Sequence, residues 1–306
     1  MITRMRFLIT TDGDSVHYLD LAREISKCQR RFASQFQNFT VMGGIIKDSN
    51  QDAVVRFNVA PDTWVTRTAL KRGKRLFDRM INQRKKEFGA QVVMPKYHDF
   101  KVGLNSDAME SNLIACVDAG GNAVPAGEWI YPYFVSEDVD WTVSNATANR
   151  NADEFRAHIC GDHVAGTGSN HDSWSKVGLI KSWIDTRPEP NNEPDTMPVT
   201  EMLADPLLNL FDETDADDEV IENLAQHNDE PPYAKSSAWG EAFGSISGVG
   251  ENLQRVAVGA CQQGAGQISA VNGFNAICGL VQLHVTGGAP GTVELLLDVK
   301  TKGAAI

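Results

Sequence analysis

The sequence predicts an all-β fold, a Greek-key β-sandwich of about nine antiparallel strands with two amphipathic helices in the N-terminal third and long surface loops. From residue 90 onward, short β-rich runs are divided by Gly, Pro, Asn and Asp, and the connections between them are long. No βα unit repeats, which argues against Rossmann and TIM-barrel folds. The composition, 42% hydrophobic and 22% charged, is that of a folded globular protein, and we expect residues 1–306 to form one domain.

Residues 16–32 predict the first helix. Apolar side chains recur near helical spacing between Leu19 and Phe32, and charged side chains fall toward the opposite side. The cations on that opposite side are Arg23, Lys27, Arg30 and Arg31.

Residues 66–87 predict a second helix, the clearest local pattern in the chain. Thr66 can serve as its N-cap, and Gly89 can end it. Apolar residues recur at spacings of three and four and define one side: Ala69, Leu70, Gly73, Leu76, Phe77, Met80 and Ile81. The opposite side carries nine cations, offset within the segment only by Asp78 and Glu87. They are Arg67, Lys71, Arg72, Lys74, Arg75, Arg79, Arg84, Lys85 and Lys86.

The remaining elements are expected to be strands and loops. Two apolar stretches at 39–46 and 53–59 are separated by the turn-like segment 47–52 and predict a β-pair. Further strands are expected at 98–104, 129–135, 155–160, 177–185, 253–260, 277–285 and 293–299. Residues 188–234 contain no Lys or Arg and a dense acidic run, which predicts a large acidic surface excursion.

The two parts of the chain differ in charge. Residues 1–101 hold 19 of the 28 Lys and Arg residues and 10 of the 40 Asp and Glu residues, so everything after residue 101 is strongly acidic. A helix that is merely solvated usually mixes Glu with Lys, because like charges four residues apart repel. The cations of the two helices therefore predict a surface that contacts a polyanion such as nucleic acid, although a solvated helix face remains the alternative.

No catalytic residue, metal site or cofactor is expected. The acidic run 212–222 lacks the ligand spacing of an EF-hand, and the glycines at 244–250 and 259–266 match neither a P-loop nor a dinucleotide fingerprint. No G-x-S-x-G element holds a serine nucleophile. A metal set drawn from Cys160, His163, His171 and Asp172 matches no standard zinc spacing.

The cysteines and the apolar runs indicate the class of protein. The five cysteines are an odd number at irregular spacing, which predicts reduced and mostly buried thiols and synthesis inside a cell. The first 11 residues do not resemble a secretory signal. The longest apolar runs are far shorter than the roughly 20 residues that cross a bilayer, so no membrane insertion is expected.

Several short strings are spread over nearly the whole chain. They are YLDLA at 18–22 followed by Arg30-Arg31, PDTWVT at 61–66, PKYHDFK at 95–101, VGLI at 177–180, DPL at 205–207, EVIENL at 219–224 before PPY at 231–233, and GL at 279–280. Together they resemble the capsid (coat) proteins of small circular Rep-encoding single-stranded DNA viruses.

This resemblance implies a single jelly-roll subunit of an icosahedral shell, with many copies of the chain as its partners and single-stranded DNA against its inner surface. The location would be the virion, after synthesis inside the host cell. Lys71-Arg72-Gly73-Lys74-Arg75 with Arg84-Lys85-Lys86 also resembles a bipartite nuclear localisation signal, which would include the nucleus. One departure matters: the first 16 residues carry only Arg4 and Arg6 as cations, so the packaging charge must lie on the folded helices.

Two alternatives stay open. A double jelly-roll subunit over a membrane would need twice as many strands. A secreted β-sandwich glycosidase or carbohydrate-binding protein would use Trp129, Trp141, Trp174 and Trp183 as stacking platforms, with Asp138 and Asp140 as paired carboxylates. The basic helix argues against that class.

Overall fold

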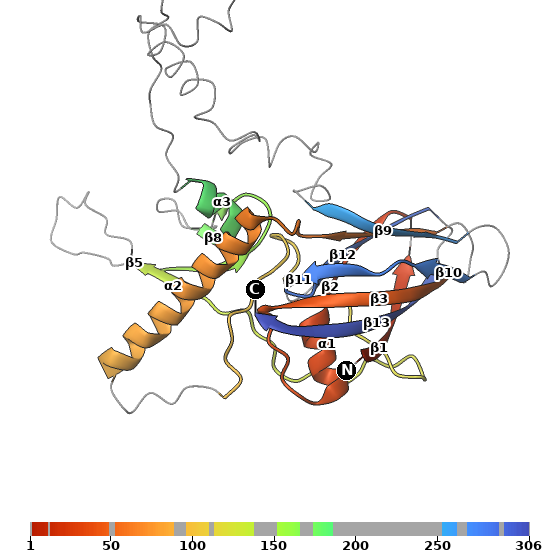
Figure 1. Ribbon diagram of the computed structural model, residues 1–306, viewed down its shortest axis with the longest axis horizontal. Helices are drawn as coiled ribbons and strands as arrows, with labels where there is room; N and C mark the ends of the chain where they lie inside the picture. The colour runs from red at the N-terminus through yellow and green to blue at the C-terminus, as the bar shows by residue number, and fades with distance from the viewer. Residues whose placement is uncertain are drawn as a thin grey trace, which may run out of the picture.

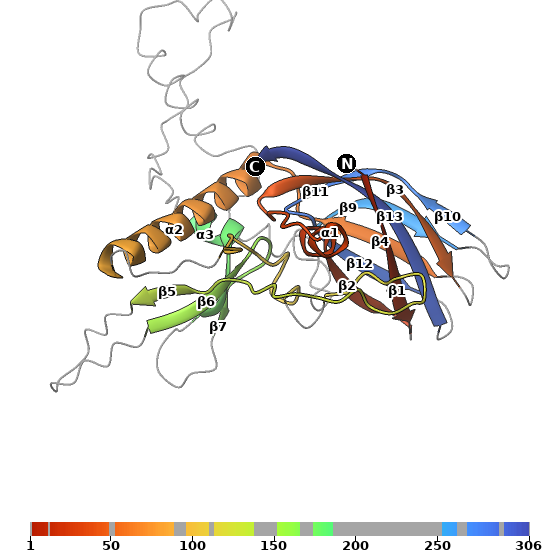
Figure 2. The same cartoon turned by 90° about the horizontal axis from the view of Figure 1, so that it is seen from below.

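The computed structural model describes residues 2–11, 13–48, 53–88, 96–109, 113–137, 152–165, 174–185, 253–261, 268–287 and 291–305. This part of the chain is mostly antiparallel β-structure, as the composition of its apolar runs predicted (Figure 1). Two large sheets occupy one end of the molecule, and the helices α2 and α3 lie with a small third sheet at the other end (Figure 2).

The two large sheets are built from strands that are far apart in sequence. The first has the order β1 (Ile2–Thr11), β13 (Gly291–Ala305), β3 (Gln37–Asp48) and β10 (Ile268–Val271), with β11 (Phe274–Ile277) also paired to β3. The second has the order β2 (Ser15–Asp20), β12 (Leu280–Thr286), β4 (Val54–Val59) and β9 (Gln254–Ala260). Every strand pair in both sheets is antiparallel.

The pairing follows one rule along the chain. The strand β1 pairs with β13, β2 pairs with β12, β3 pairs with β10, and β4 pairs with β9. These four antiparallel pairs are nested, so that together they form one long hairpin whose two arms are β1 to β4 and β9 to β13. The hairpin is folded over, and β13 therefore also pairs with β3, and β12 with β4. The tip of the hairpin is the connection from β4 to β9, and all the structure between residues 60 and 253 is inserted there.

The core between the two large sheets comes from period-two alternation. On β1, Met5, Phe7 and Ile9 are buried, and on β13 the alternate residues from Val293 to Val299 are fully buried. Successive side chains of a strand point to opposite faces, so each strand contributes every second residue to this core. The chain crosses from β11 to β12 within Cys278 and Gly279, both at positive φ of 57° and 69°.

The helix α1 (Leu21–Gln29) begins where β2 ends. The Asp20 carboxylate caps it by accepting a hydrogen bond from the Arg23 amide at 3.1 Å, and the helix ends at Arg30 in the left-handed region with φ 49°. Leu21 and Ile25 are buried in the core between the sheets. The prediction of one helix over 16–32 was therefore partly wrong. Residues 15–20 form β2, because pairing with β12 overrides the local helical spacing.

The helix α2 (Trp64–Phe88) packs against a second core. Its buried residues Ala69, Leu70 and Phe77 contact a cluster that includes Phe100 and Ile180. Gly73 permits this close packing, because a Cβ there would lie 3.0 Å from the Phe100 ring and 3.1 Å from Leu179.

Three details of α2 differ from the sequence prediction. The helix begins two residues earlier than expected, and Thr63 rather than Thr66 supplies the capping oxygen, which accepts from the Thr66 amide at 3.2 Å. Leu76 was placed on the apolar side but is 48% exposed. The predicted end at Gly89 lies outside the described residues.

The third sheet has the order β5 (Phe134–Glu137), β6 (Ala152–His158), β8 (Trp174–Gly178) and β7 (Val164–Ala165), and its β6–β8 pair is parallel. The helix α3 (Leu179–Asp185) follows β8 directly. The predicted strand at 177–185 was wrong beyond Gly178, because Leu179, Ile180 and Trp183 recur at helical spacing and pack against the α2 side of the second core.

Other predicted strands also need correction. The stretches 39–46 and 53–59 form β3 and β4, but they lie in different sheets and do not pair with each other. Residues 98–104 and 129–133 form no strand, and only an isolated bridge joins Gly103 to His158. The strands β1, β7 and β10 were not predicted, nor was β11 apart from Ile277. The predicted strand 277–285 corresponds to β12 from Leu280 onward. The acidic segment 188–234 lies outside the described residues, as do 138–149. Among the described helices, none is both long and apolar enough to span a bilayer.

Candidate nucleic-acid interface

The outward side of α2 carries a row of cations. Arg67, Lys71, Arg75 and Arg79 are exposed and follow one another at four-residue spacing, so they lie on one side of the helix about 6 Å apart along its axis. Lys85 and Lys86 are exposed in the last turns. We call these six residues the α2 cation row. The helix also bears Arg84, whose side chain is outside the described atoms.

Two further cations of α2 pack along its flanks. Lys74 Nζ lies 5.5 Å from the Phe36 ring centroid and 3.4 Å from an Asp78 carboxylate oxygen. On the other flank the Arg72 guanidinium lies 5.8 Å from the Trp183 ring centroid. Lys74 therefore lies on the flank of α2 toward the 32–36 segment and Arg72 on the flank toward α3, while the buried residues of α2 pack on the second core.

Carboxylates neutralise little of the α2 cation row. Arg67 forms a bidentate pair with Asp62 at 2.6 and 2.8 Å, which raises the pKa of Arg67 and lowers that of Asp62. Within the part of the chain that the structure describes, Lys71, Arg75 and Arg79 have no carboxylate within ion-pair distance. A row of this kind can bind an anion with repeated charges, because phosphates placed along it would relieve the repulsion between neighbouring cations.

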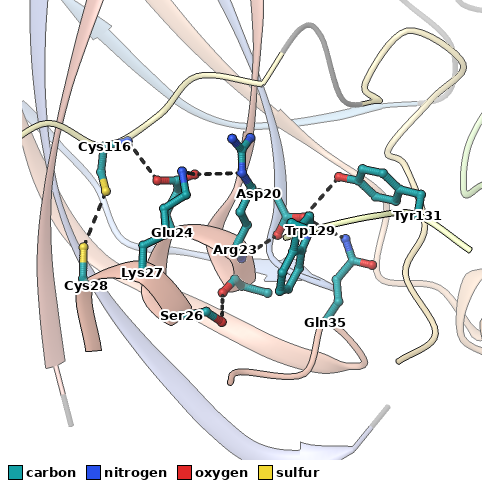
Figure 3. Close-up of polar contacts among 11 residues, drawn as sticks. Asp20, Arg23, Glu24, Ser26, Lys27, Cys28, Gln35, Cys116, Trp129 and Tyr131 are labelled. Atoms are coloured by element: carbon teal, nitrogen blue, oxygen red, sulfur yellow. Dashed lines mark hydrogen bonds and ion pairs between the residues drawn. The ribbon is translucent and has the colours of Figure 1, made fainter. Parts of the chain in front are cut away.

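The structure removes two residues of α1 from the predicted interface. Lys27 is only 6% exposed at its side chain, and its Nζ lies 2.7 Å from a Glu24 carboxylate oxygen. Arg23 Nε lies 3.5 Å from the same oxygen. The buried Glu24 also accepts a hydrogen bond from the Cys116 amide at 2.9 Å, as Figure 3 shows. Arg30 and Arg31 remain exposed at the end of α1.

A buried carboxylate organises the region between the two helices. Besides capping α1, Asp20 accepts hydrogen bonds from Trp129 Nε1 at 2.9 Å, Tyr131 Oη at 3.2 Å and Gln35 Nε2 at 3.2 Å (Figure 3). Burial raises the pKa of Asp20 to about 6, and the hydrogen bonds from the Arg23 amide, Trp129 and Tyr131 oppose that shift. The Asp20 network therefore ties α1, the 32–36 segment and the 129–131 segment together.

Aromatic rings and lysines cluster beside this network. The Phe32 ring centroid lies 6.3 Å from that of Trp129 and 6.1 Å from that of Tyr97. Lys101 Nζ lies 4.9 Å from the Trp129 ring centroid and 5.7 Å from that of Phe32, and burial lowers the pKa of Lys101. Lys96 Nζ lies 5.5 Å from the Tyr97 ring centroid. We call these five residues the aromatic–cation cluster.

The sequence did not single out this cluster as a binding site. Trp129 was considered only as a sugar platform, and Tyr97, Lys96 and Lys101 entered only as part of the string at 95–101. The local signal was the alternation of lysines with aromatic residues between 96 and 101. What brings that segment to Phe32 is a set of hydrogen bonds from Ser34 and the Gln35 amide to Asp99 at 2.8 and 3.2 Å.

The residues weighed for other chemistry occupy ordinary positions. The Nε2 atom of the buried His158 lies 3.0 Å from the Asp162 carbonyl oxygen, at hydrogen-bond distance. Burial lowers the pKa of His158 to about 4, although this hydrogen bond acts in the opposite direction. His163 Nδ1 accepts from the Gly178 amide at 3.1 Å. Among the described residues no group of three metal-ligating side chains forms, and His171 and Asp172 lie outside them. So do Trp141, Asp138 and Asp140, while the Trp183 ring packs under Arg72.

The five cysteines are all free, and four are buried, as predicted. Cys28 is exposed, and its Sγ lies 3.5 Å from that of Cys116. Burial raises the pKa of Cys116 and Cys278 well above the ordinary thiol range, so neither forms the reactive thiolate.

We therefore expect Ellman's reagent to titrate a single thiol in the native protein and all five after denaturation. The Cys28→Ser variant should titrate none before denaturation. Rapid reaction of two or more thiols in the native wild type would contradict the packing described for Cys116 and Cys278.

Comparison of the chain with protein-family models, with curated proteins and with solved structures found no match.

Proposed function

We propose that this chain is a jelly-roll subunit of an icosahedral viral capsid, which assembles with many copies of itself around single-stranded DNA. The observation that carries the proposal is the α2 cation row, which lies exposed on a chain whose net charge is −12. Like charges on one helix destabilise it unless an external anion balances them. Polymeric phosphate supplies that balance and gains affinity by releasing condensed counterions.

The strand order supports the jelly-roll part of the proposal. Eight strands form a hairpin in which the first pairs with the last, and the hairpin winds into two four-stranded orders, β1-β13-β3-β10 and β2-β12-β4-β9. A double-sheet jelly roll has eight strands and two Greek keys, and it is the architecture of viral capsid domains, lectins and cupins. Because one fold serves several functions, the choice among these classes depends on the charged surface.

The same topology favours a single over a double jelly roll. The described strands supply one set of eight with the short β11 added beside β10 on β3, and the remaining strands β5 to β8 form a small separate sheet. In the proposed shell, α2 and the end of α1 face the genome, and apolar contacts between subunit edges hold the copies together. The chain would be made inside the host cell, with the nucleus as one compartment, and would end up in the virion.

Negative-stain electron microscopy of the purified recombinant chain tests this function. We expect closed particles of uniform size, and an absorbance ratio at 260 and 280 nm that falls after nuclease treatment of disassembled particles. A chain that stays a small species at every protein and salt concentration, with the absorbance ratio of pure protein, would contradict the proposal. Binding or cleavage of oligosaccharides by that species would favour the carbohydrate-active class instead.

A further inference from the structure

We propose that the aromatic–cation cluster is a stacking site for a base of single-stranded nucleic acid, distinct from the phosphate-binding α2 cation row. This inference rests on the proposed function and adds a second kind of contact to it. Proteins that bind single strands without sequence preference combine cations that follow the backbone with aromatic rings on which bases stack. The α2 cation row has the first of these features, and the cluster has the second.

The rings of the cluster are graded from buried to exposed. The hydrogen bond from Trp129 Nε1 to Asp20 fixes the orientation of the innermost ring, and Phe32 lies between Trp129 and Tyr97. The outermost ring, Tyr97, is 60% exposed, although the rest of the cluster is at least half-buried apart from Lys96. A tyrosine held at the surface on a packed aromatic base offers a ring face at little cost in side-chain entropy.

The charge around Tyr97 suits a nucleotide better than a neutral ligand. Lys96 lies over the Tyr97 ring, and the exposed Arg31 directly precedes Phe32. Lys101 contacts Phe32 and Trp129 but is only 6% exposed, so it supports the rings from inside the fold. The nearby carboxylate of Asp99 is held by Ser34 and by the Gln35 amide. A base on Tyr97 would therefore have the exposed Lys96 beside it to receive a flanking phosphate.

Packed rings connect the segment that carries Phe32 to one flank of α2. Phe36 connects the two sites: its ring lies 5.5 Å from Lys74 Nζ of α2 and 6.2 Å from the Phe100 ring, and Phe100 in turn contacts Phe77 of α2 at 5.7 Å. Phe32 precedes Phe36 by four residues in the same non-helical segment. A strand bound to the α2 cation row would pass this flank, because Lys74 lies between Lys71 and Arg75 in the helix.

The test compares two oligonucleotides that carry the same number of phosphates, oligo(dT) and an abasic oligonucleotide. Binding to the purified full-length chain, freed of nucleic acid in high salt, is followed by fluorescence anisotropy. We expect the wild type to bind oligo(dT) about tenfold more tightly than the abasic oligonucleotide, which is the scale of one stacked base. The Tyr97→Ala variant should bind the two equally, and Tyr97→Phe should keep the preference because it keeps the ring.

Tyr133→Ala is the matched control. Tyr133 is 43% exposed and stacks with Arg156 at 4.3 Å from the ring centroid, but it lies at the third sheet and outside the cluster. Its removal should leave the preference for oligo(dT) unchanged. The slope of affinity against salt should be the same in Tyr97→Ala and the wild type, because no phosphate contact is removed.

The outcomes separate this inference from the proposed function. Equal binding of both oligonucleotides by the wild type, or a preference that survives in Tyr97→Ala, would overturn the stacking site and leave the α2 cation row standing. A loss of preference in Tyr133→Ala as great as in Tyr97→Ala would also overturn it. A wild type that binds neither oligonucleotide would overturn the inference and the proposed function together.

Discussion

Reversing three cations of the α2 cation row, in the triple variant Lys71→Glu, Arg75→Glu and Arg79→Glu, is expected to remove most of the salt-dependent binding of single-stranded DNA. Each lost phosphate contact lowers the slope of log affinity against log salt by about 0.7 for a single strand, so three lost contacts lower it by about 2. The measurement is a salt titration of oligo(dT) binding, together with the absorbance ratio of the purified protein. The three side chains are exposed, so the fold should survive the change.

The matched control reverses the same amount of charge elsewhere. Lys47, Arg255 and Lys300 are exposed on strands of the two large sheets rather than on α2, and their change to Glu shifts the net charge equally. We expect this control to keep nearly the wild-type slope. If both triple variants lose binding alike, net charge rather than the α2 cation row governs the interaction, and the genome-facing role of α2 is wrong.

The Asp20→Ala variant is expected to lose about 3–5 kcal/mol of unfolding free energy, the largest loss of stability we predict. The substitution removes the cap of α1 and leaves the buried donors of Gln35, Trp129 and Tyr131 without their shared acceptor. Urea denaturation measures it as a shift of the midpoint at constant slope. Asp62→Ala is the control: it also removes a carboxylate with a helix partner, but the Arg67 pair is exposed and should cost less than about 1 kcal/mol.

The pH dependence of that difference follows from the raised pKa of Asp20. Its folded pKa of about 6 lies above the ordinary 3.8, so protonation favours the folded state. The stabilising effect of this shift is complete below the unfolded pKa and is lost as the pH rises through about 6. The advantage of the wild type over Asp20→Ala should therefore shrink by about 1 kcal/mol between about pH 5 and pH 7. A larger advantage at the higher pH would show that the four hydrogen bonds outweigh burial.

The elements that the sequence predicted well are those whose pattern is local. Helix α2 shows apolar residues at three and four with cations opposite, and both features depend only on the residues of the helix itself. Strands β4, β9 and β13 were found because β-branched and aliphatic residues dominate each run. All three strands lie in the large sheets, where burial reinforces the local preference.

The errors arise where distant pairing decides the structure. Residues 15–20 have helical spacing, yet they form a strand because β12, more than 250 residues later, supplies its partner. The β3 and β4 stretches look like a hairpin, but their partners lie near the C-terminus in separate sheets. The sequence predicted Lys27 as a surface cation, because nothing in the sequence around Glu24 indicates that this carboxylate is buried. In the structure Glu24 is buried and accepts a hydrogen bond from the Cys116 amide, and it draws Lys27 into an ion pair.

The pairing of β1 with β13 sets an order of events during synthesis. The first large sheet cannot close before β13 has been synthesised, and the second cannot close before β12, because these strands pair with β1 and β2. Contacts of such sequence separation form slowly. Helix α2, by contrast, is synthesised about 200 residues before β13, and its hydrogen bonds are short-range. It can therefore form early, because helices form on a far faster timescale than sheets of this kind. The nascent chain therefore exposes its positive helix before the two large sheets have formed. If the proposed function holds, an RNA that binds the helix at that stage has to be exchanged for the genome later.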